Sequence, residues 1–529
     1  MMQIISFLGF TVLVAVVSYL ATRKTNEDSS DGYFLGGRSL TGVVIAGSLL
    51  LTNLSTEQIV GLNGSAFKEG ILVMAWETLA AIAMVITAVF LLPRYLKGGI
   101  TTVPQFLEKR YDKMTKTITS GLFLSGYVVV LLPIVLYSGA LAINSMFNVP
   151  EMLDVSKTTA LWITVWGIGI IGSIYAIFGG LKAVAVSDTI NAVGLLVGGL
   201  LIPFFGLLAI GDGSIGDGIS TLMTTNPDKF KALGGPDSAI PFGTIFTGMM
   251  LVQLFYWGTN QAIIQRALGA KNLKEGQKGL LLASGVKILG PLIVVLPGII
   301  AFHMFGNTLE NPDEAYPRLV TEVLPAGLVG FFAAVLFGAI LSSFNSALNS
   351  SVTLFGIDIY KSHINKEATE HQTVFAGKSF GMILAILSMC IAPLIANAPD
   401  GLFGYLQEVN GCYSIPILTI VVVGYLTKYV PAVAAKVAII SGVILYSLSQ
   451  FVIKPFVVGA DNYPHFLHVL AILFVLNVVI MLIIGKLYPR KEPFILEFTK
   501  QVDITPWKHL KIVGIAICAI VIGIYVYFS

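Results

Sequence analysis

Apolar stretches long enough to cross a membrane recur along the whole chain. A bilayer core about 30 Å thick needs roughly 20 largely apolar residues per helix. Polar or charged segments separate about fourteen such stretches. The pattern therefore predicts an all-α membrane protein with spans near 3–21, 41–63, 71–92, 117–146, 158–179, 183–210, 242–266, 278–305, 326–354, 374–398, 402–427, 433–453, 463–485 and 507–528.

The composition agrees with a membrane protein. Of the 529 residues, 55% are hydrophobic and 12% are charged, and the mean hydropathy is +0.84. A soluble domain carries about 25% charged residues, so these values exclude an ordinary soluble enzyme, a disordered chain and a nucleic-acid-binding protein. Cys390, Cys412 and Cys518 are spaced neither as a metal site nor as a disulfide framework.

Lysine and arginine gather in alternate loops. The loops after the first, third, seventh and thirteenth spans are basic, beginning with Arg23 and Lys24, whereas the loop that contains Glu310 and Glu314 is acidic. Cytoplasmic loops carry the excess of Lys and Arg, so both termini are predicted to lie outside. The loops are too short to fold alone, so residues 1–529 are predicted to form a single transmembrane domain.

Polar clusters interrupt two of the predicted spans. The second span contains TNLSTEQ at 52–58, and the seventh contains Gln253, Tyr256 and Asn260. Polar groups at membrane depth must line a cavity or be buried in protein. The two spans are five apart, which predicts two inverted five-span repeats, roughly 41–210 and 242–427, with the substrate site of a secondary transporter between them. The alternative is that the clusters only hold helices together.

Ionisable residues lie inside three other predicted spans. Glu77 and Lys287 are near the centres of theirs, where they could pair and hydrogen-bond a polar solute. A purely structural ion pair and a snorkelling lysine are the alternatives. Asp188 could hold a cation or relay a proton, or it could cap a helix or pair with Lys182.

Hydroxyl groups cluster in the ninth span, which carries Ser342, Ser343 and Ser346. Neutral oxygens suit a sodium ion when backbone carbonyls freed in a broken helix join them. Serines in a membrane helix also bond back to their own backbone, so the hydroxyls alone leave both interpretations open. The sequence contains no P-loop, GxSxG, HExxH or CxxC motif, which argues against an enzyme.

Five runs in order resemble the sodium/solute symporter family, in particular its bacterial sodium/galactose branch. They are GYFLGGRSL at 32–40, TNLSTEQIVGLNGSAF at 52–67, IYAIFGGLKAVAVSD at 174–188, FYWGTNQAIIQRALGAKN at 255–272 and SSFNSALNSSVTLFGIDIYK at 342–361. The resemblance covers nearly the whole chain. It implies a LeuT-type fold in a bacterial plasma membrane and sodium-coupled uptake of a neutral sugar by alternating access.

The resemblance also implies ion ligands. One sodium ion is expected at the carbonyls of Leu51, Leu54 and Ala339 and the hydroxyls of Ser342 and Ser343. Some members hold a second ion, and their ligands match Asp188, Ser342 and Ser346. Asn345 stands where those members have serine, so the match to the second site is incomplete.

A sugar site is implied as well. Its polar residues match Asn53, Gln58, Glu77, Lys287 and Gln407, with Gln253, Trp257 and Asn260 around them; Tyr256 is expected to close the site from inside, and Leu62, Trp76 and Phe403 from outside. Three positions depart from a galactose site, namely Ala80, Gln253 and Leu131. A hexose or a relative is therefore the expected solute. Sialic acid, another carboxylate, a polyol, or a sugar-sensing role are the alternatives, and a sensor should carry a signalling domain.

Overall fold

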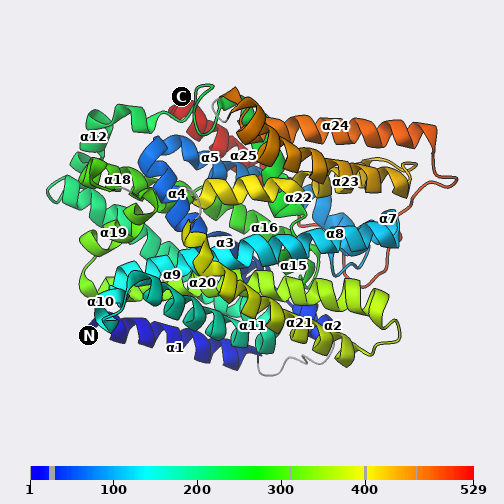
Figure 1. Ribbon diagram of the computed structural model, residues 1–529, viewed down its shortest axis with the longest axis horizontal. Coiled ribbons are helices and arrows are strands. Elements are labelled where there is room, and N and C mark those ends of the chain that lie inside the picture. Colours follow the sequence, from blue (N-terminus) through cyan, green and yellow to red (C-terminus); the bar gives the residue numbers. More distant parts are fainter. Residues whose placement is uncertain (1, 23–29, 310, 398–401, 460–461) are drawn as a thin grey trace.

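The computed structural model describes the chain apart from residues 1, 23–29, 310, 398–401 and 460–461. Arg23, Lys24 and Glu310, which entered the charge argument above, lie outside the described residues. The described residues form a bundle of long helices joined by loops and short helices (Figure 1). The expectation of an all-α membrane protein is confirmed.

Within the described residues, eleven helices are long and apolar enough to span a membrane. The count rises to twelve with the pair α16 (Leu273–Lys287) and α17–α18 (Gly290–Phe305), which is bent by 51°. The two remaining predicted spans are the interrupted ones. Each of these spans is divided into two short helices. The first consists of α3 (Gly42–Asn53) and α4 (Thr56–Glu69), and the second contains α14 (Met250–Gly258) and α15 (Gln261–Leu268).

The other main helices follow the predicted spans closely. They are α1 (Met2–Thr22), α5 (Ala75–Ile86), α8 (Lys113–Gly126), α9 (Leu132–Phe147), α11 (Lys157–Ile210), α20 (Ala326–Thr353), α21 (Glu370–Ile391), α22 (Leu402–Leu426), α23 (Ala432–Leu448), α24 (Phe466–Leu487) and α25 (Leu510–Tyr527). Shorter helices lie between the predicted spans, among them α7 (Val103–Arg110), α12 (Ile215–Thr225) and α19 (Ala315–Val323).

Helix α11 contains two candidate spans, Lys157–Ile177 and Leu181–Ile210, which correspond to the predicted spans 158–179 and 183–210. The Tyr175 hydroxyl donates to the Ala183 carbonyl at 3.0 Å. In a straight helix these two residues would lie about 12 Å apart along the axis, which is farther than the tyrosine side chain can reach. The chain must therefore turn between the two spans. The turn brings both halves of α11 against the same neighbours.

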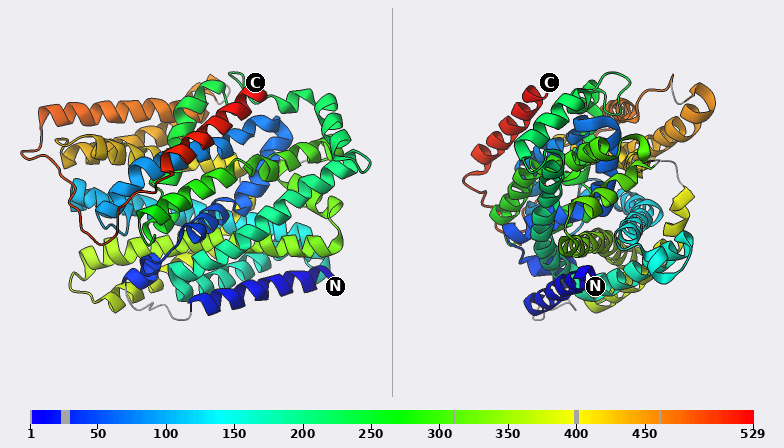
Figure 2. Two further views of the ribbon diagram at one scale, coloured as in Figure 1. Left: turned by 180° about the vertical axis from the view of Figure 1, so that it is seen from behind. Right: turned by 90° about the vertical axis from the view of Figure 1, so that its left-hand side faces the viewer.

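Helices α3 and α20 lie at the centre of the bundle. Helix α3 packs against α11, α15, α16 and α20, and α20 packs against α1, α9, α11 and α21. The outermost helices α1 and α25 lie on opposite margins, as the right-hand view of Figure 2 shows. The interrupted spans are thus surrounded by protein, which is what exposed backbone groups at membrane depth require.

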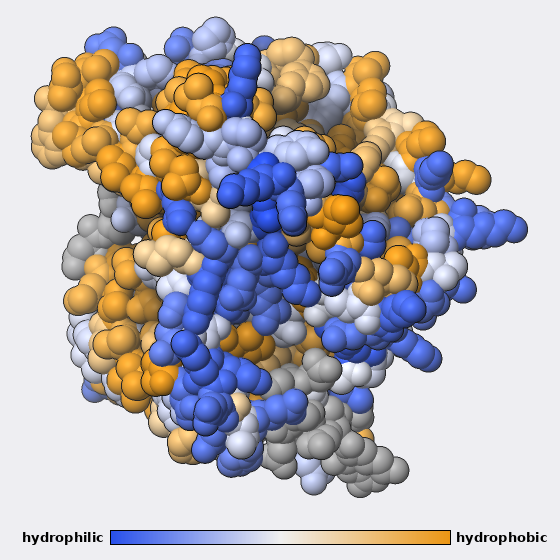
Figure 3. All heavy atoms as spheres, turned by 90° about the vertical axis from the view of Figure 1, so that its right-hand side faces the viewer, coloured by the Kyte–Doolittle hydropathy of each residue, from blue (hydrophilic) through white to orange (hydrophobic). Residues whose placement is uncertain are grey.

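One end of the bundle is strongly hydrophilic (Figure 3). Helix α7 (Val103–Arg110) ends there, and Arg110 donates to the carbonyls of Gly424, Thr427 and Val430, which satisfies the end of α22. Both termini lie toward the opposite end of the bundle (Figure 2). This arrangement is the one that the orientation predicted from loop charge requires.

Candidate functional site

The first interruption separates α3 from α4. Leu54 leaves helical geometry (φ −75°, ψ 53°) and Ser55 is extended, so the chain turns before Thr56 starts α4. The Leu54 amide still donates to the Leu50 carbonyl at 2.7 Å, but the later carbonyls of α3 lose their helical donors. Ser, Thr and Asn compete with helices for backbone hydrogen bonds, which explains why this polar run breaks here.

The second interruption separates α14 from α15. Asn260 caps α15: its Oδ1 accepts from the Ala262 amide at 3.0 Å and from the Tyr127 hydroxyl at 2.9 Å. The Phe255 carbonyl accepts from the amides of both Thr259 and Asn260. The break is therefore fixed by named hydrogen bonds, one of which comes from a distant helix segment at 127–131.

Hydroxyl groups of α20 face the first interruption. The Ser343 hydroxyl donates to the Thr52 carbonyl at 3.1 Å, and the Thr52 hydroxyl lies 3.3 Å from that of Ser342 and 3.1 Å from that of Ser346. The residues whose carbonyls were predicted to join them, Leu51, Leu54 and Ala339, are fully or almost fully buried. This concentration of neutral oxygens can hold a small monovalent cation. Thr52 was not among the predicted ligands.

A chain of polar side chains runs away from the same interruption. The Asn53 amide donates to Gln58 Oε1 at 3.2 Å, and the Gln58 amide donates to Glu77 Oε1 at 2.5 Å. Lys287 Nζ lies 2.5 Å from Glu77 Oε2, and both charged side chains are 0% exposed. The lysine therefore does not snorkel. Gly290 allows this packing, since a Cβ there would collide with the Glu77 carboxylate.

Gln253 and Trp257 form a second polar group beside this chain. Trp257 Nε1 donates to Gln253 Oε1 at 3.1 Å, and Gln253 Nε2 donates to the Trp76 carbonyl at 2.8 Å. Both ends of the Gln253 amide are thus engaged by protein groups. Lys287 Nζ lies 5.8 Å from the centre of the Trp257 ring, which adds a cation–π contact to the buried lysine.

A small cavity of about 50 Å³ lies between the two interruptions. Five predicted solute or gate residues line it: Gln58, Tyr256, Asn260, Phe403 and Gln407. Typical small-molecule pockets measure roughly 300–1,000 Å³, so the cavity is in a closed form that must widen around a solute. The departure residue Leu131 also lines it, whereas Ala80 does not.

The other predicted residues stand behind this cavity. Glu77, Lys287, Gln253 and Trp257 are linked to its wall through the polar contacts above and do not line it. Trp76 meets the lining residue Phe403 edge to face, with ring centres 5.2 Å apart. Leu62 is buried in α4 and is not a lining residue.

Several lining residues had no predicted role. They are Thr52, Glu57, Ala262, Ile263, Leu406, Asn410 and Tyr413. Glu57 is the most informative, because it is buried and its Oε2 has no hydrogen-bond partner among the described residues. It belongs to the polar run that marked the broken span, so the sequence held a signal for it.

Asp188 packs against α3 at Ser48, one helical turn before the cavity-lining residue Thr52. Ser48 Oγ donates to Asp188 Oδ2 at 2.7 Å, and the alternative pairing with Lys182 is not among the described contacts. Arg266 Nε donates to the same Ser48 hydroxyl at 3.2 Å. Arg266 is the last residue of the predicted span 242–266, and its side chain is completely buried.

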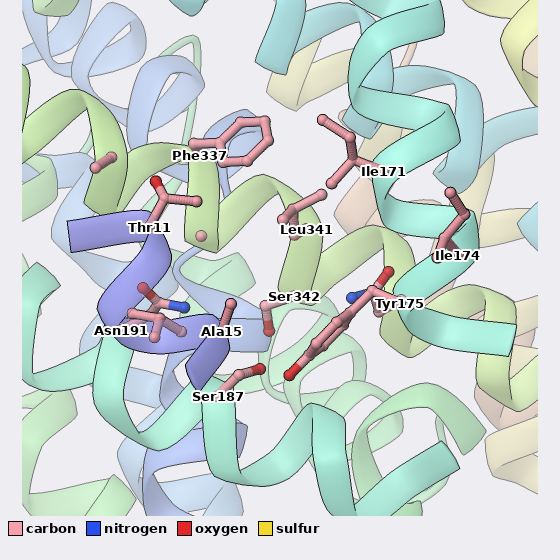
Figure 4. Close-up of a pocket in the computed structure, with 14 residues that line it drawn as sticks. Thr11, Ala15, Ile171, Ile174, Tyr175, Ser187, Asn191, Phe337, Leu341 and Ser342 are labelled. Carbon is pink, nitrogen blue, oxygen red and sulfur yellow. The ribbon is translucent and has the colours of Figure 1, made fainter. Parts of the chain in front are cut away.

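A larger cavity, about 280 Å³, lies between α1, α11 and α20 (Figure 4). Its walls are apolar, with Ile171, Phe337 and Leu341 among them, and Asn191 and Ser342 supply polar groups. It is larger than the cavity at the interruptions, but it touches neither of the broken spans. We therefore place the solute site at the smaller cavity, where polar side chains from both interrupted spans converge.

The model of the sodium:solute symporter family matches residues 33–444. The chain belongs to this family. It is 50% identical over 524 residues to the uncharacterized symporter YidK of Escherichia coli K12, across 99% of this chain and 90% of that protein. It is 32% identical over 472 residues to the sodium/glucose cotransporter of Vibrio parahaemolyticus, across 84% of each chain.

Among solved structures, the fold matches that of a Na⁺-coupled sialic acid symporter in a substrate-bound outward-open state. The TM-score is 0.78 at 20% identity, and the match covers 93% of this chain and 99% of that one. The fold is therefore of the LeuT type. Membership of the family makes the protein a multi-pass membrane transporter that carries a small solute together with sodium, and not an enzyme.

Proposed function

We propose that the protein carries a neutral sugar, a hexose or a close relative, with sodium across a bacterial plasma membrane. The observation that carries this proposal is the charge balance at the cavity. Lys287 is fully paired with Glu77, so it offers no free positive charge to an anionic solute. Anions are usually bound by arginine, whose forked donors fit a carboxylate, and Arg266 donates to protein groups instead.

Hydrogen bonding supports the same solute. The amides of Gln58 and Gln407 and the hydroxyl of Tyr256 belong to the cavity wall, and such groups suit sugar hydroxyls. In our proposal, Asn53, Glu77 and Lys287 hold Gln58 in place and meet the sugar when the cavity widens. Gln253, Trp257 and Asn260 support the wall from the second interrupted span.

Two repeats of five spans, roughly 41–210 and 242–427, supply the alternating access. Tyr256 closes the cavity from inside, and Leu62, Trp76 and Phe403 close it from outside. Sodium binds at Leu51, Leu54, Ala339, Ser342 and Ser343, next to the first interruption. The YidK and Vibrio relatives are bacterial proteins, which supports the location, and the Vibrio relative is named for glucose.

Binding to the purified protein tests the solute. Sodium-dependent heat of binding is expected with galactose, glucose or a related hexose or polyol, and none with sialic acid or monocarboxylates. Sodium-dependent binding of sialic acid without binding of any hexose or polyol would reject the proposal. The similarity to the sialic acid symporter does not favour that outcome, because at 20% identity it concerns the fold.

A further inference from the structure

A long groove lies between α3, α16 and α25, at the margin of the bundle that α25 forms (Figure 2). Its volume is about 510 Å³, and it shares no lining residue with the cavity at the interruptions. Most of its wall is apolar: Val43, Leu282 and Leu289 line it and are 63%, 47% and 45% exposed. Exposed apolar surface of this kind marks a contact with lipid or with another protein.

The groove is about as long as one leaflet of a bilayer is thick. Along α16 its lining extends from Lys278 to Leu289, and a straight helix of that length rises about 16 Å. Half of a hydrocarbon core about 30 Å thick is about 15 Å. Gly285 keeps the groove open midway, since a Cβ there would meet no atom within 4 Å. An extended acyl chain therefore fits along the groove.

Polar and aromatic groups gather at one end of the groove. Lys278 and Glu275 line this end and form an ion pair at 3.1 Å. The Trp507 amide donates to Gln277 Oε1 at 2.8 Å, which holds Trp507 beside Lys278. Tryptophan next to a membrane helix favours the level of the lipid headgroups. This end is therefore the one where a headgroup would lie.

Lysines surround the same end. Lys274 lies one helical turn before Lys278 on α16, Lys508 directly follows Trp507, and Lys511 is in the first turn of α25. Lys274, Lys508 and Lys511 are exposed. This segment also belongs to the end of the bundle that the loop charges predict to be cytoplasmic. Basic pockets between membrane helices on that side suit anionic lipid headgroups.

The carboxylates nearby are already engaged by the protein. Glu275 Oε2 accepts from the Gly42 amide at 2.8 Å, and its other oxygen meets Lys278. Asp503, whose carbonyl accepts from the Leu273 amide, uses its Oδ1 to accept from the amide and the hydroxyl of Thr505. The four lysines outnumber these two acids, so the headgroup end attracts a negative charge.

We propose that this groove binds an anionic phospholipid of the cytoplasmic leaflet, with one acyl chain along α16 and the phosphate beside Lys278 and Trp507. A membrane helix of a partner protein would cross both leaflets and would not need a cluster of lysines at one end. The lipid would also contact Gly42 and Val43, at the start of the helix that leads to the first interruption. The proposal is independent of the sugar and of the sodium site.

Native mass spectrometry of the purified full chain tests the proposal. Protein stripped of lipid in detergent is titrated with phosphatidylglycerol and, separately, with phosphatidylethanolamine of the same acyl chains. Phosphatidylglycerol is expected to bind at least about fivefold more tightly, since one lysine near an anionic headgroup contributes about that factor. Gly285→Leu fills the groove and should abolish this binding. Lys278→Gln should weaken it about fivefold.

Gly121→Leu is the matched control. Gly121 lies in α8, and a Cβ there also meets no atom within 4 Å, so this variant should bind phosphatidylglycerol like the wild type. Melting temperatures in lipid-free detergent show whether each variant is folded, and Lys278→Gln decides alone if Gly285→Leu is not. Equal binding of the two lipids by the wild type, or wild-type binding of phosphatidylglycerol by a folded Gly285→Leu or by Lys278→Gln, would overturn the proposal. So would a dimer that binds no lipid and dissociates in Gly285→Leu, because a second copy would then occupy the groove.

Discussion

At the scale of single residues, four buried charged side chains form two pairs. Lys287 meets Glu77 directly, and Arg266 reaches Asp188 through Ser48. Such pairs add little net stability, but removing one member strands the other charge in the membrane interior. The effect of a substitution at these positions on stability must therefore be measured separately from its effect on solute binding.

Lys287→Met is expected to lower stability by about 3–5 kcal/mol, because Glu77 loses its counterion. Adding Glu77→Gln should recover much of that loss, since no charge is then stranded. Solute binding should not return in the double variant if both side chains contact the sugar. Thermal melting and calorimetric titration measure the two effects, and a wild-type melting temperature in Lys287→Met would contradict the ion pair.

Ser343→Ala is expected to raise the sodium concentration for half-maximal uptake roughly tenfold. A hydrogen bond or ligand contact to a charged group contributes about 1.5 kcal/mol or more, and 1.4 kcal/mol is a tenfold change. Uptake into proteoliposomes over a range of sodium concentrations measures this. Ser351→Ala, two turns further along the same helix, serves as the control; equal behaviour of the two variants would place the ion elsewhere.

At the scale of helices, both interruptions could be found from sequence because each is a polar run in an apolar span. The two runs share a cavity wall, with Gln58 from one and Tyr256 and Asn260 from the other. The hydrogen-bond partners of the buried side chains around this cavity could not be predicted. Arg266 and Ser48 are 218 residues apart in the chain, and no local pattern indicates which distant hydroxyl a buried arginine will meet.

The same limit applies to the solute site. The family resemblance placed Gln253 and Trp257 around the sugar site, whereas their hydrogen bonds are made to each other and to the Trp76 carbonyl. Helix α12 was missed because a short amphipathic helix outside the membrane lacks the long apolar run that identified the others. Span positions followed from hydropathy, but side-chain partners required coordinates.

Tyr256→Ala is expected to abolish accumulation while the protein still reaches the membrane. Tyr256 lies at the end of α14 beside the second interruption and lines the cavity, so its ring can close the inner exit. Tyr256→Phe retains the ring and should keep most of the accumulation. Counterflow and net uptake in vesicles separate binding from coupling, and full accumulation by Tyr256→Ala would exclude this gate.

At the scale of the whole molecule, the strongly hydrophilic end and the two termini lie at opposite ends of the bundle. If that end faces the cytoplasm, as the charge of the loops predicts, sodium and solute enter from the side that carries the termini. An inside-negative potential then drives each inward positive charge.

Uptake is expected to require sodium and to rise with an inside-negative potential. One charge crossing 100 mV contributes about 2.3 kcal/mol, and a tenfold sodium gradient adds about 1.4 kcal/mol. For each sodium ion carried per cycle, the sum sustains an accumulation of roughly a few hundred-fold. Proteoliposomes with imposed potassium diffusion potentials measure this. Uptake that persists when choline replaces sodium, or that runs on a proton gradient alone, would contradict the coupling.

Thr52 lies between the proposed sodium site and the proposed solute site. Its carbonyl and hydroxyl meet the serines of α20, and the same residue borders the cavity that holds Gln58 and Gln407. A residue shared by two sites can couple the binding of their two ligands. Such coupling is reciprocal: if bound sodium increases the affinity for the solute by some factor, bound solute increases the affinity for sodium by the same factor. A cell rich in the solute would therefore load the carrier with sodium even where sodium is scarce.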